Sequence, residues 1–442
     1  MASGSKNHEQ LTNLFLSSNI PNFEDSSAYS SSSSSSSSQS EVIADDRIVI
    51  LSAVRSPIGK AGRGGFKDMF PEEILSKILA ESIKQCNLKH EEIADITVGN
   101  VLQPGGGAGM IRIAAFEAGF PETTCVSAVN RQCASGLEAI ASVAGRIKLG
   151  VYNVAIAGGV ESMSKNDIKS AMPIVNTSVM QRFPNAKACA LPMGVTSDNV
   201  AKLYSISRSD QDRFAYYSHL KAYAAQESGY FQREIVELNG INKDEGVRIN
   251  TSEEALKKLK SVFSSSGNGT TTAGNSSQVS DGASALVVSR MSYAKARSLT
   301  PLAVWLSYAV AGVPPQLMGI GPAVAIPEAL LKANLTLGDI DLFEINEAFA
   351  SQCLYCVRHL GIPMEKLNIS GGAIALGHPL GSSGARLVVT MIHNLQRLNL
   401  RYGVISLCIG TGMGAAAVIE NPNFRNNSSG GASPVSKLRS RL

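Results

Sequence analysis

Apolar strand-like segments alternate with amphipathic helix-like segments along this chain, and the alternation occurs in two rounds. The first round opens with β-branched residues over 47–54, continues with a helical stripe over 71–86 and ends with a strand at 153–157. The second round repeats the order, with strands expected at 303–310, 341–345, 403–409 and 415–419. Such alternation predicts a mixed or parallel sheet covered by helices, and the repeated order suggests two related domains.

A looser stretch between the rounds, about 161–273, is interpreted as an insertion in the first domain. An apolar strand at 283–288 then completes the sheet of that domain. A length of 442 residues is too great for one ordinary core and agrees with several domains. We expect a first domain of 46–165 plus 274–300, an inserted loop domain of 166–273 and a second domain of 301–420.

The two ends of the chain differ in composition from the rest. Nine consecutive serines, Ser30 to Ser38, cannot bury enough apolar area to offset the loss of chain entropy on folding. Residues 421–442 are rich in Asn, Ser and Gly and have few large apolar side chains. These compositions predict disordered tails over 1–45 and 421–442.

Charge and cysteine spacing exclude several classes of protein. A net charge of +4, without a basic run interleaved with aromatic residues, does not indicate a nucleic-acid partner. Seven cysteines, with no framework-like spacing, indicate reduced thiols. Cys353 and Cys356 have metal or redox spacing, but no second ligand pair is nearby, so no metal site is expected. No apolar run reaches the ~18 residues of a membrane span, so none is expected.

The segment 129–136, VNRQCASG, places Cys133 between a short strand and a helix with an apolar stripe. Free backbone N–H groups and the helix dipole stabilise a thiolate at a helix start. Small neighbouring residues let a substrate approach closely, so Cys133 is a candidate nucleophile. The alternative is a small buried hydrophobic residue, as most free cysteines are.

A single histidine, His378, lies among four glycines in the segment 370–381 and is followed by Pro379. A rigid glycine-rich loop can hold an imidazole beside a thioester. There the ring can take a proton from a thiol or donate a hydrogen bond to an oxyanion. The alternative is a loop histidine whose hydrogen bond goes to a backbone carbonyl.

Two further segments place polar candidates at the ends of expected strands. Cys408 and Gly410 lie in a strand followed by alternating glycines, whose N–H groups suit an oxyanion hole. A glycine-rich hairpin is the alternative there. Asn346 lies where a strand meets a helix expected from Glu347 to Leu360. It is either the N-cap of that helix or a residue that orients a water molecule.

Together these segments resemble the thiolase family over about 46–420. The resemblance implies an α/β fold of two similar domains, each a mixed five-stranded sheet covered by helices, with a loop domain inserted in the first. Related condensing enzymes pair their cysteine with two histidines, whereas the third position here is Cys408. The matching segments are VNRQCASG (129–136), GGVESMS (158–164), TAGNSSQVSDGA (272–283), EINEAFA (344–350), GGAIALGHPLG (371–381) and CIGTGMG (408–414).

The resemblance also implies a role for each matching residue. Cys133 would be the nucleophile that holds the acyl group, and His378 would activate it and later deprotonate the CoA thiol. Cys408 would move a proton on and off the acetyl methyl carbon. Asn346, through a water, and His378 would bind one thioester oxygen. The N–H groups of Cys133 and Gly410 would bind the other.

The implied reaction is cleavage of 3-ketoacyl-CoA by CoA, giving acetyl-CoA and a shortened acyl-CoA in fatty-acid β-oxidation. CoA is a co-substrate, and neither a metal nor another cofactor is expected. Ser277 would contact the pantetheine of CoA, the inserted loops would cover it, and the protein would be a homodimer. The alternatives are an acetoacetyl-CoA thiolase of biosynthesis, which uses the same residues, and an inactive lipid carrier or scaffold on this fold.

The chain ends in Ser440-Arg441-Leu442, a close variant of the Ser-Lys-Leu peroxisomal signal. This ending predicts binding to the peroxisomal import receptor and a location in the peroxisome matrix, with the cytoplasm as the alternative. The fullest resemblance, to the peroxisomal members of the family, points the same way.

Overall fold

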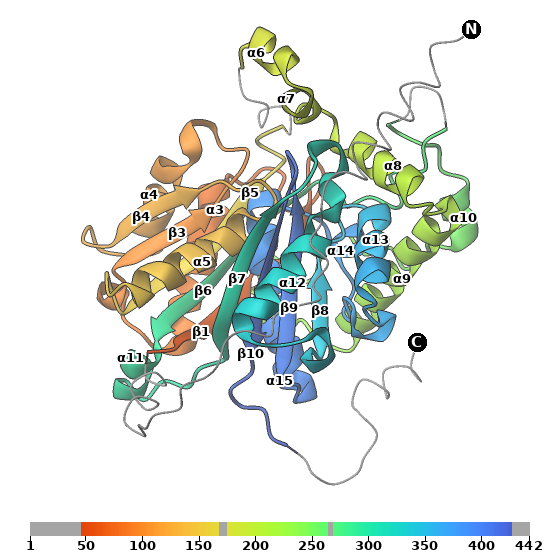
Figure 1. The fold of residues 1–442 in the computed structure, drawn as a ribbon. Helices are drawn as coiled ribbons and strands as arrows, with labels where there is room; N and C mark the ends of the chain where they lie inside the picture. Colours follow the sequence, from red (N-terminus) through yellow and green to blue (C-terminus); the bar gives the residue numbers. More distant parts are fainter. Residues whose placement is uncertain (1–45, 168–174, 264–267, 427–442) are drawn as a thin grey trace, which may run out of the picture. The chain divides into compact units, whose positions relative to one another are not determined.

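The computed structural model describes residues 46–167, 175–263 and 268–426 (Figure 1). The predicted tail over 1–45 and the signal Ser440-Arg441-Leu442 lie outside these residues. The fold continues past 420, where the sequence predicted a tail to begin. The buried Asn421 amide donates hydrogen bonds to the carbonyl oxygens of Leu395 and Leu400, which holds this segment against the end of the second half.

A single mixed sheet extends through the described residues. Its strands are β1 (Ile48–Arg55), β2 (Gly59–Lys60), β3 (Asp95–Gly99), β4 (Cys125–Val129), β5 (Val154–Ser162), β6 (Ser280–Arg290), β7 (Ala303–Gly312), β8 (Leu342–Ile345), β9 (Tyr402–Ile409) and β10 (Met413–Glu420). Their order is β4-β3-β5-β6-β1-β7-β10-β9-β8, with β2 beside β6. The mixed sheet with its helices confirms the predicted α/β fold. The two predicted five-stranded sheets are one continuous sheet, because the antiparallel pair β1–β7 joins the two halves.

The two halves of the sheet differ in size. The first half has six strands, including the two-residue β2, and β4, β3 and β5 are parallel to one another. In the second half, only β8 is parallel to its neighbour, and the strand expected at 367–370 is reduced to one bridge between Phe343 and Leu367. Asn368 has a φ of 42°, so the chain turns there and the strand cannot continue.

Helices connect the strands and cover the sheet. Within the described residues they are α3 (Pro71–Cys86), α4 (Ala108–Glu117), α5 (Ser135–Lys148), α6 (Thr177–Arg182), α7 (Pro184–Ala188), α8 (Met193–Leu203), α9 (Arg208–Glu227), α10 (Glu253–Lys257), α11 (Met291–Ala296), α12 (Gly321–Ala333), α13 (Ala350–Leu360), α14 (Ala373–Leu376) and α15 (Leu380–Leu398). None of these helices is long and apolar enough to cross a membrane.

One hydrophobic cluster packs residues from both halves of the sheet against two helices. Leu137 and Ile140 of α5 pack in one cluster with Leu387 of α15 and with residues of both sheet halves, so α5 and α15 form a central layer. The outer faces are covered by α3 and α4 on one side and by α12 and α13 on the other. Each fully buried Leu or Ile contributes about 1.5–3 kcal/mol through the hydrophobic effect.

The starts of α5 and α15 approach closely because both carry glycine. A Cβ at Gly136 would lie 2.7 Å from the backbone nitrogen of Ala385, and one at Gly384 would lie 2.4 Å from that of Leu137. Cys133 precedes α5 and His378 precedes α15, so this contact brings the two candidate loops together.

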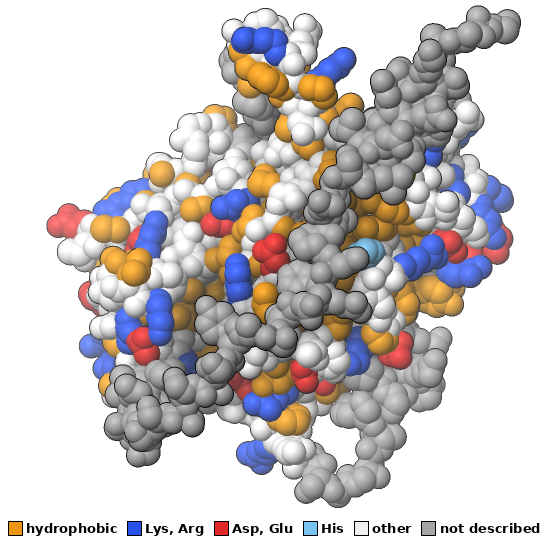
Figure 2. Space-filling view, viewed as in Figure 1, with side chains coloured by type: hydrophobic (Ala, Val, Ile, Leu, Met, Phe, Trp, Pro, Cys, Tyr) orange, Lys and Arg blue, Asp and Glu red, His pale blue; other side chains and the backbone are white. Residues whose placement is uncertain are grey.

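The segment between β5 and β6 contains α6 to α10. Figure 1 shows α8, α9 and α10 beside α13 and α14, while α6 and α7 project from the sheet. Figure 2 shows basic and hydrophobic side chains on that projection, which include Arg182, Lys187 and the 60% exposed Phe183. Later in the segment, Glu234 accepts a hydrogen bond of 2.7 Å from the buried Arg55 and thereby ties the insertion to β1.

Candidate active site

Cys133 lies in the turn between β4 and α5. Gln132 has a φ of 48°, and Ser135 Oγ accepts the N–H of Arg131 at 2.9 Å, so the turn is held by its own polar groups. The side chain of Cys133 is 5% exposed, and the backbone N–H of Gly410 donates to its sulfur. A residue from the second half therefore completes the surroundings of a cysteine from the first.

Burial governs the ionisation of Cys133. It raises the pKa of the thiol to about 11, although the N–H groups of Gly410 and of Cys133 itself oppose the shift. The sequence predicted that the helix start would stabilise a thiolate, but the cost of burying the charge is larger. Cys133 therefore needs a base to become a nucleophile.

His378 follows the short helix α14 in a glycine-rich turn. Gly377 has a φ of 118°, and a Cβ there would lie 2.3 Å from Ser280 Oγ, so only glycine fits. Ser383 Oγ donates to the Pro379 carbonyl oxygen at 3.1 Å, which uses its one hydrogen. At 2.5 Å it must then accept from Nδ1–H of His378, so the lone pair of a base lies on Nε2.

Burial and the charge of Arg386 lower the pKa of His378 to about 3. The imidazole is therefore neutral near pH 7. Together with the raised pKa of Cys133, this makes a neutral thiol and a neutral imidazole the resting forms of the two groups.

Asn346 leaves the end of β8 and faces His378. Its side-chain Nδ2 lies 3.3 Å from His378 Nε2, and its backbone N–H donates to Ser406 at 2.9 Å. Helix α13 begins at Ala350 with Phe349 as N-cap, so Asn346 is not the cap, and the helix starts later than the predicted Glu347. Its buried Oδ1 has no hydrogen-bond partner among the described residues.

Cys408 lies near the end of β9, and its side chain is 1% exposed. Burial raises its pKa well above the usual value, and the nearby charge of an ionised Cys133 raises it further. The segment is also the hairpin considered as an alternative, since β9 and β10 pair directly. A hairpin at this segment is therefore compatible with a site that contains Cys408 and Gly410.

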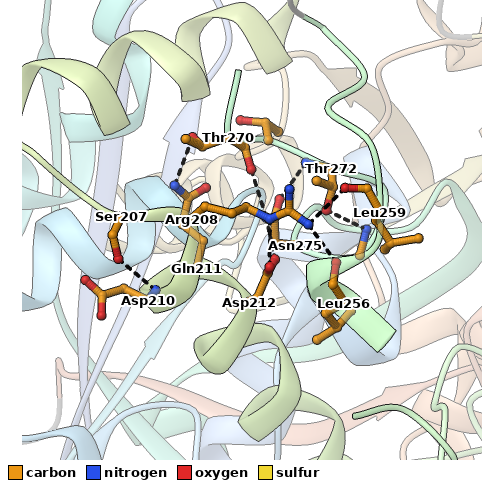
Figure 3. Close-up of polar contacts among 12 residues, drawn as sticks. Ser207, Arg208, Asp210, Gln211, Asp212, Leu256, Leu259, Thr270, Thr272 and Asn275 are labelled. Carbon is orange, nitrogen blue, oxygen red and sulfur yellow. Dashed lines mark hydrogen bonds and ion pairs between the residues drawn. The ribbon is translucent and has the colours of Figure 1, made fainter. Parts of the chain in front are cut away.

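Ser277 is partly exposed, and its backbone N–H donates to Ala348 at 2.9 Å. The preceding Asn275 donates to Asp212 at 3.0 Å, and Arg208 donates to the other oxygen of Asp212 at 2.7 Å. Figure 3 shows Asp212 between these two residues. Asp212 is fully buried, so this network fixes the Ser277 loop on α9.

Sequence reasoning did not find several polar residues that hold the site. Glu161 at the end of β5 is buried and accepts N–H groups of Leu102 at 3.1 Å and Gly381 at 2.9 Å. It therefore links a segment near Cys133 to the loop of His378, and burial raises its pKa to about 7. A carboxylate inside an otherwise apolar strand was the available signal. Ser383 and Gln352 gave no comparable signal.

In the residues that the structure describes, no group of three or more His, Cys, Asp or Glu side chains has the arrangement of a metal site. Cys353 and Cys356 are both buried in α13, and the thiol of Cys356 donates to the Gly319 carbonyl oxygen at 3.4 Å.

Comparison with known proteins gives matches along most of the chain. The family model of the thiolase N-terminal domain matches residues 48–292, and that of the C-terminal domain matches 299–421. Peroxisomal 3-ketoacyl-CoA thiolase B of Rattus norvegicus is 54% identical over 389 residues, which are 85% of this chain and 91% of the rat protein.

Solved structures agree with these matches. The dimeric peroxisomal thiolase of Saccharomyces cerevisiae has a TM-score of 0.81 at 44% identity and is covered to 98% by 85% of this chain. Human mitochondrial 3-ketoacyl-CoA thiolase in complex with CoA has a TM-score of 0.78 at 35% identity, with coverage of 85% of this chain and 98% of that one. On both domains and over nearly its whole described length, this chain belongs to the thiolase family.

Proposed function

We propose that this protein cleaves 3-ketoacyl-CoA with CoA, forming acetyl-CoA and a shortened acyl-CoA in fatty-acid β-oxidation. The observation that supports this most strongly is the convergence of separate segments on one buried site. The Gly410 N–H reaches the Cys133 sulfur, and Asn346 Nδ2 lies 3.3 Å from His378 Nε2. The rat relative at 54% identity is named for this activity.

In the first half of the reaction, His378 takes the proton of Cys133 through Nε2 while the sulfur attacks C3 of the substrate. The C2–C3 bond then breaks, and its electron pair moves to C2 as an enolate. The thiol of Cys408 gives its proton to C2, so acetyl-CoA leaves and the acyl group remains on Cys133.

In the second half, the imidazolium of His378 returns a proton to the Cys408 thiolate, and neutral His378 then accepts the proton of the CoA thiol. The CoA sulfur attacks the acyl carbonyl, and the bond to Cys133 breaks. Cys133 leaves as a thiolate and regains a proton from His378. In the net reaction, the CoA hydrogen appears on the acetyl methyl group and no residue is changed.

Two oxyanions form during these steps and need donors. The N–H groups of Cys133 and Gly410 converge at the sulfur, where the alkoxide at C3 would develop. The enolate oxygen would be bound by protonated His378 Nε2 and by a water that Asn346 orients. This division gives each charge its own pair of hydrogen-bond donors.

CoA would bind between the insertion and the second half. Ser277 is assigned to its pantetheine, since this loop borders an apolar patch of Met318, Phe349 and Cys408. The basic and apolar side chains of α6 and α7 suit a segment that covers an anionic thioester. The solved human mitochondrial relative is described in complex with CoA.

The same proposal includes the organisation of the protein. Its domains are 46–165 with 274–300, the insertion 166–273, and 301–420. The yeast neighbour is a dimer, and β4 is a partly exposed edge strand that suits pairing with a second copy. Peroxisomal import through Ser440-Arg441-Leu442 agrees with the names of the rat and yeast proteins.

A thiolysis assay over a chain-length series of 3-ketoacyl-CoAs, with the acyl-enzyme trapped and mapped by mass, tests the function. We expect cleavage of medium or long chains and an acyl adduct on Cys133. Activity on the four-carbon substrate alone would point to an acetoacetyl-CoA thiolase, and no cleavage would point to an inactive carrier or scaffold.

Peroxisomal import is tested with a fluorescent protein fused to the N-terminus of the chain. The fusion should be found in peroxisomes, and the same fusion without the last three residues should remain outside them.

A further inference from the structure

The side chain of Gln352 lies against Cys408 inside the buried site. Gln352 is in the first turn of α13, and its side chain is fully buried. The end of its amide lies 3.2 Å from Cys408 Sγ. The reaction scheme proposed above assigns no task to this residue.

The other neighbours of the amide decide which of its atoms faces Cys408. The position beside Sγ also lies 3.0 Å from the carbonyl oxygen of Asn346, and the other amide position lies 2.7 Å from the backbone nitrogen of Cys353. A carbonyl oxygen needs a donor and an N–H needs an acceptor. Nε2 therefore faces Asn346 and Cys408, and Oε1 faces Cys353.

This orientation determines where the thiol hydrogen of Cys408 can go. The two hydrogens of Nε2 serve the Asn346 carbonyl oxygen and Cys408 Sγ, so Gln352 offers no acceptor to the thiol. The S–H bond is left free to point at a substrate. When the proton has left, the same N–H donates to the thiolate and stabilises it in a site that otherwise disfavours charge.

We propose that Gln352 is a positioning residue for proton transfer by Cys408, because it orients the thiol and stabilises the thiolate. The inference rests on the proposed function, in which Cys408 gives its proton to the enolate. In that step the S–H bond breaks, a C–H bond forms at the acetyl methyl carbon, and sulfur keeps the electron pair.

Two exchange reactions separate this role from a structural one. Exchange of the acetyl-CoA methyl hydrogens with D2O requires Cys408, whereas acetyl transfer from acetyl-CoA to labelled CoA requires Cys133 and His378. In Gln352→Met we expect the hydrogen exchange to slow roughly tenfold to a hundredfold, which is the usual effect of one hydrogen bond to a charged group. Acetyl transfer should stay within about twofold.

Gln352→Glu keeps the size of the side chain and serves if the Met variant does not fold. A carboxylate repels a neighbouring thiolate, so exchange should slow at least as much and the alkaline limb of its pH profile should move to higher pH. Ser351→Ala is the matched control. Ser351 is an equally buried neighbour in α13 that bonds Ser197 at 2.7 Å, and its loss should leave both exchange rates unchanged.

Equal losses of both activities in the Gln352 variants would mean a structural role and would overturn the inference. So would normal hydrogen exchange in them, provided that Cys408→Ala abolishes exchange in the same assay. If Cys408→Ala exchanged at the normal rate, the proposed function of Cys408 would be wrong, and the role of Gln352 with it. The Cys408 variant therefore distinguishes the two failures.

Discussion

Cys133 and Cys408 bring the same thiol to one site from two kinds of local structure. Cys133 lies in a turn before a helix, 5% exposed, and its sulfur receives a backbone N–H from Gly410. Cys408 lies within β9, 1% exposed, and its sulfur lies 3.2 Å from the side-chain amide of Gln352. Burial raises the pKa of both thiols.

The difference suits two separate tasks. Backbone N–H groups at Cys133 are fixed in place and can also bind an oxyanion that forms beside the sulfur. Cys408 is more deeply enclosed, and burial raises its pKa, so it holds its proton until a carbanion is formed next to it. The sequence places Cys133 at a helix start and Cys408 in a strand, and the structure adds what each sulfur contacts.

Replacement of Cys133 should have the largest effect. In Cys133→Ala no acyl-enzyme can form, so we expect turnover to fall by at least about 10^4-fold. Iodoacetamide labelling at position 133, mapped by mass, should disappear, while the thermal unfolding temperature stays close to that of the wild type. Persistent turnover would show that Cys133 is not the nucleophile, and the two thiols would then not have the separate tasks proposed for them.

Replacement of Cys408 should separate the two thiols. In Cys408→Ala the nucleophile remains, so acyl transfer between CoA thioesters should continue. Thiolysis should fall by about 10^3-fold, because the enolate loses its acid. Parallel rate measurements of both reactions on the same preparation check this. Equal losses in both would mean that Cys408 also supports the acylation of Cys133.

The secondary structure around the site was more predictable from the sequence than the contacts between distant segments. Strands and helices followed from the hydrophobic period, and the limits of α3 agree with the prediction to the residue. The late start of α13 did not follow, because Phe349 pairs with Ser276 from a distant loop. The raised pKa of Cys133 was missed for a similar reason: local sequence indicates the helix start but not the burial that outweighs it.

The pH dependence of alkylation tests that burial directly. With a thiol pKa of about 11, the thiolate fraction of Cys133 should increase about tenfold for each pH unit below that value. The rate of modification by iodoacetamide at position 133 should therefore increase about 100-fold from pH 7 to pH 9. If the modification rate instead reached a plateau below pH 8, Cys133 would be ionised as an ion pair with His378. The ionisation of Cys133 would then differ more from that of Cys408.

The smallest expected effect concerns Ser383, which orients the base that activates Cys133. Ser383→Ala removes the acceptor of His378 Nδ1–H, so the ring is no longer held in the form with a free Nε2 lone pair. Acyl transfer should slow about tenfold, since general-base catalysis depends on that lone pair. Exchange of acetyl-CoA methyl hydrogens should slow as well, because His378 also returns a proton to Cys408 and binds the enolate oxygen. If both reactions kept their wild-type rates, Ser383 would not fix the imidazole, and the dependence of Cys133 and Cys408 on one oriented base would lose its structural basis.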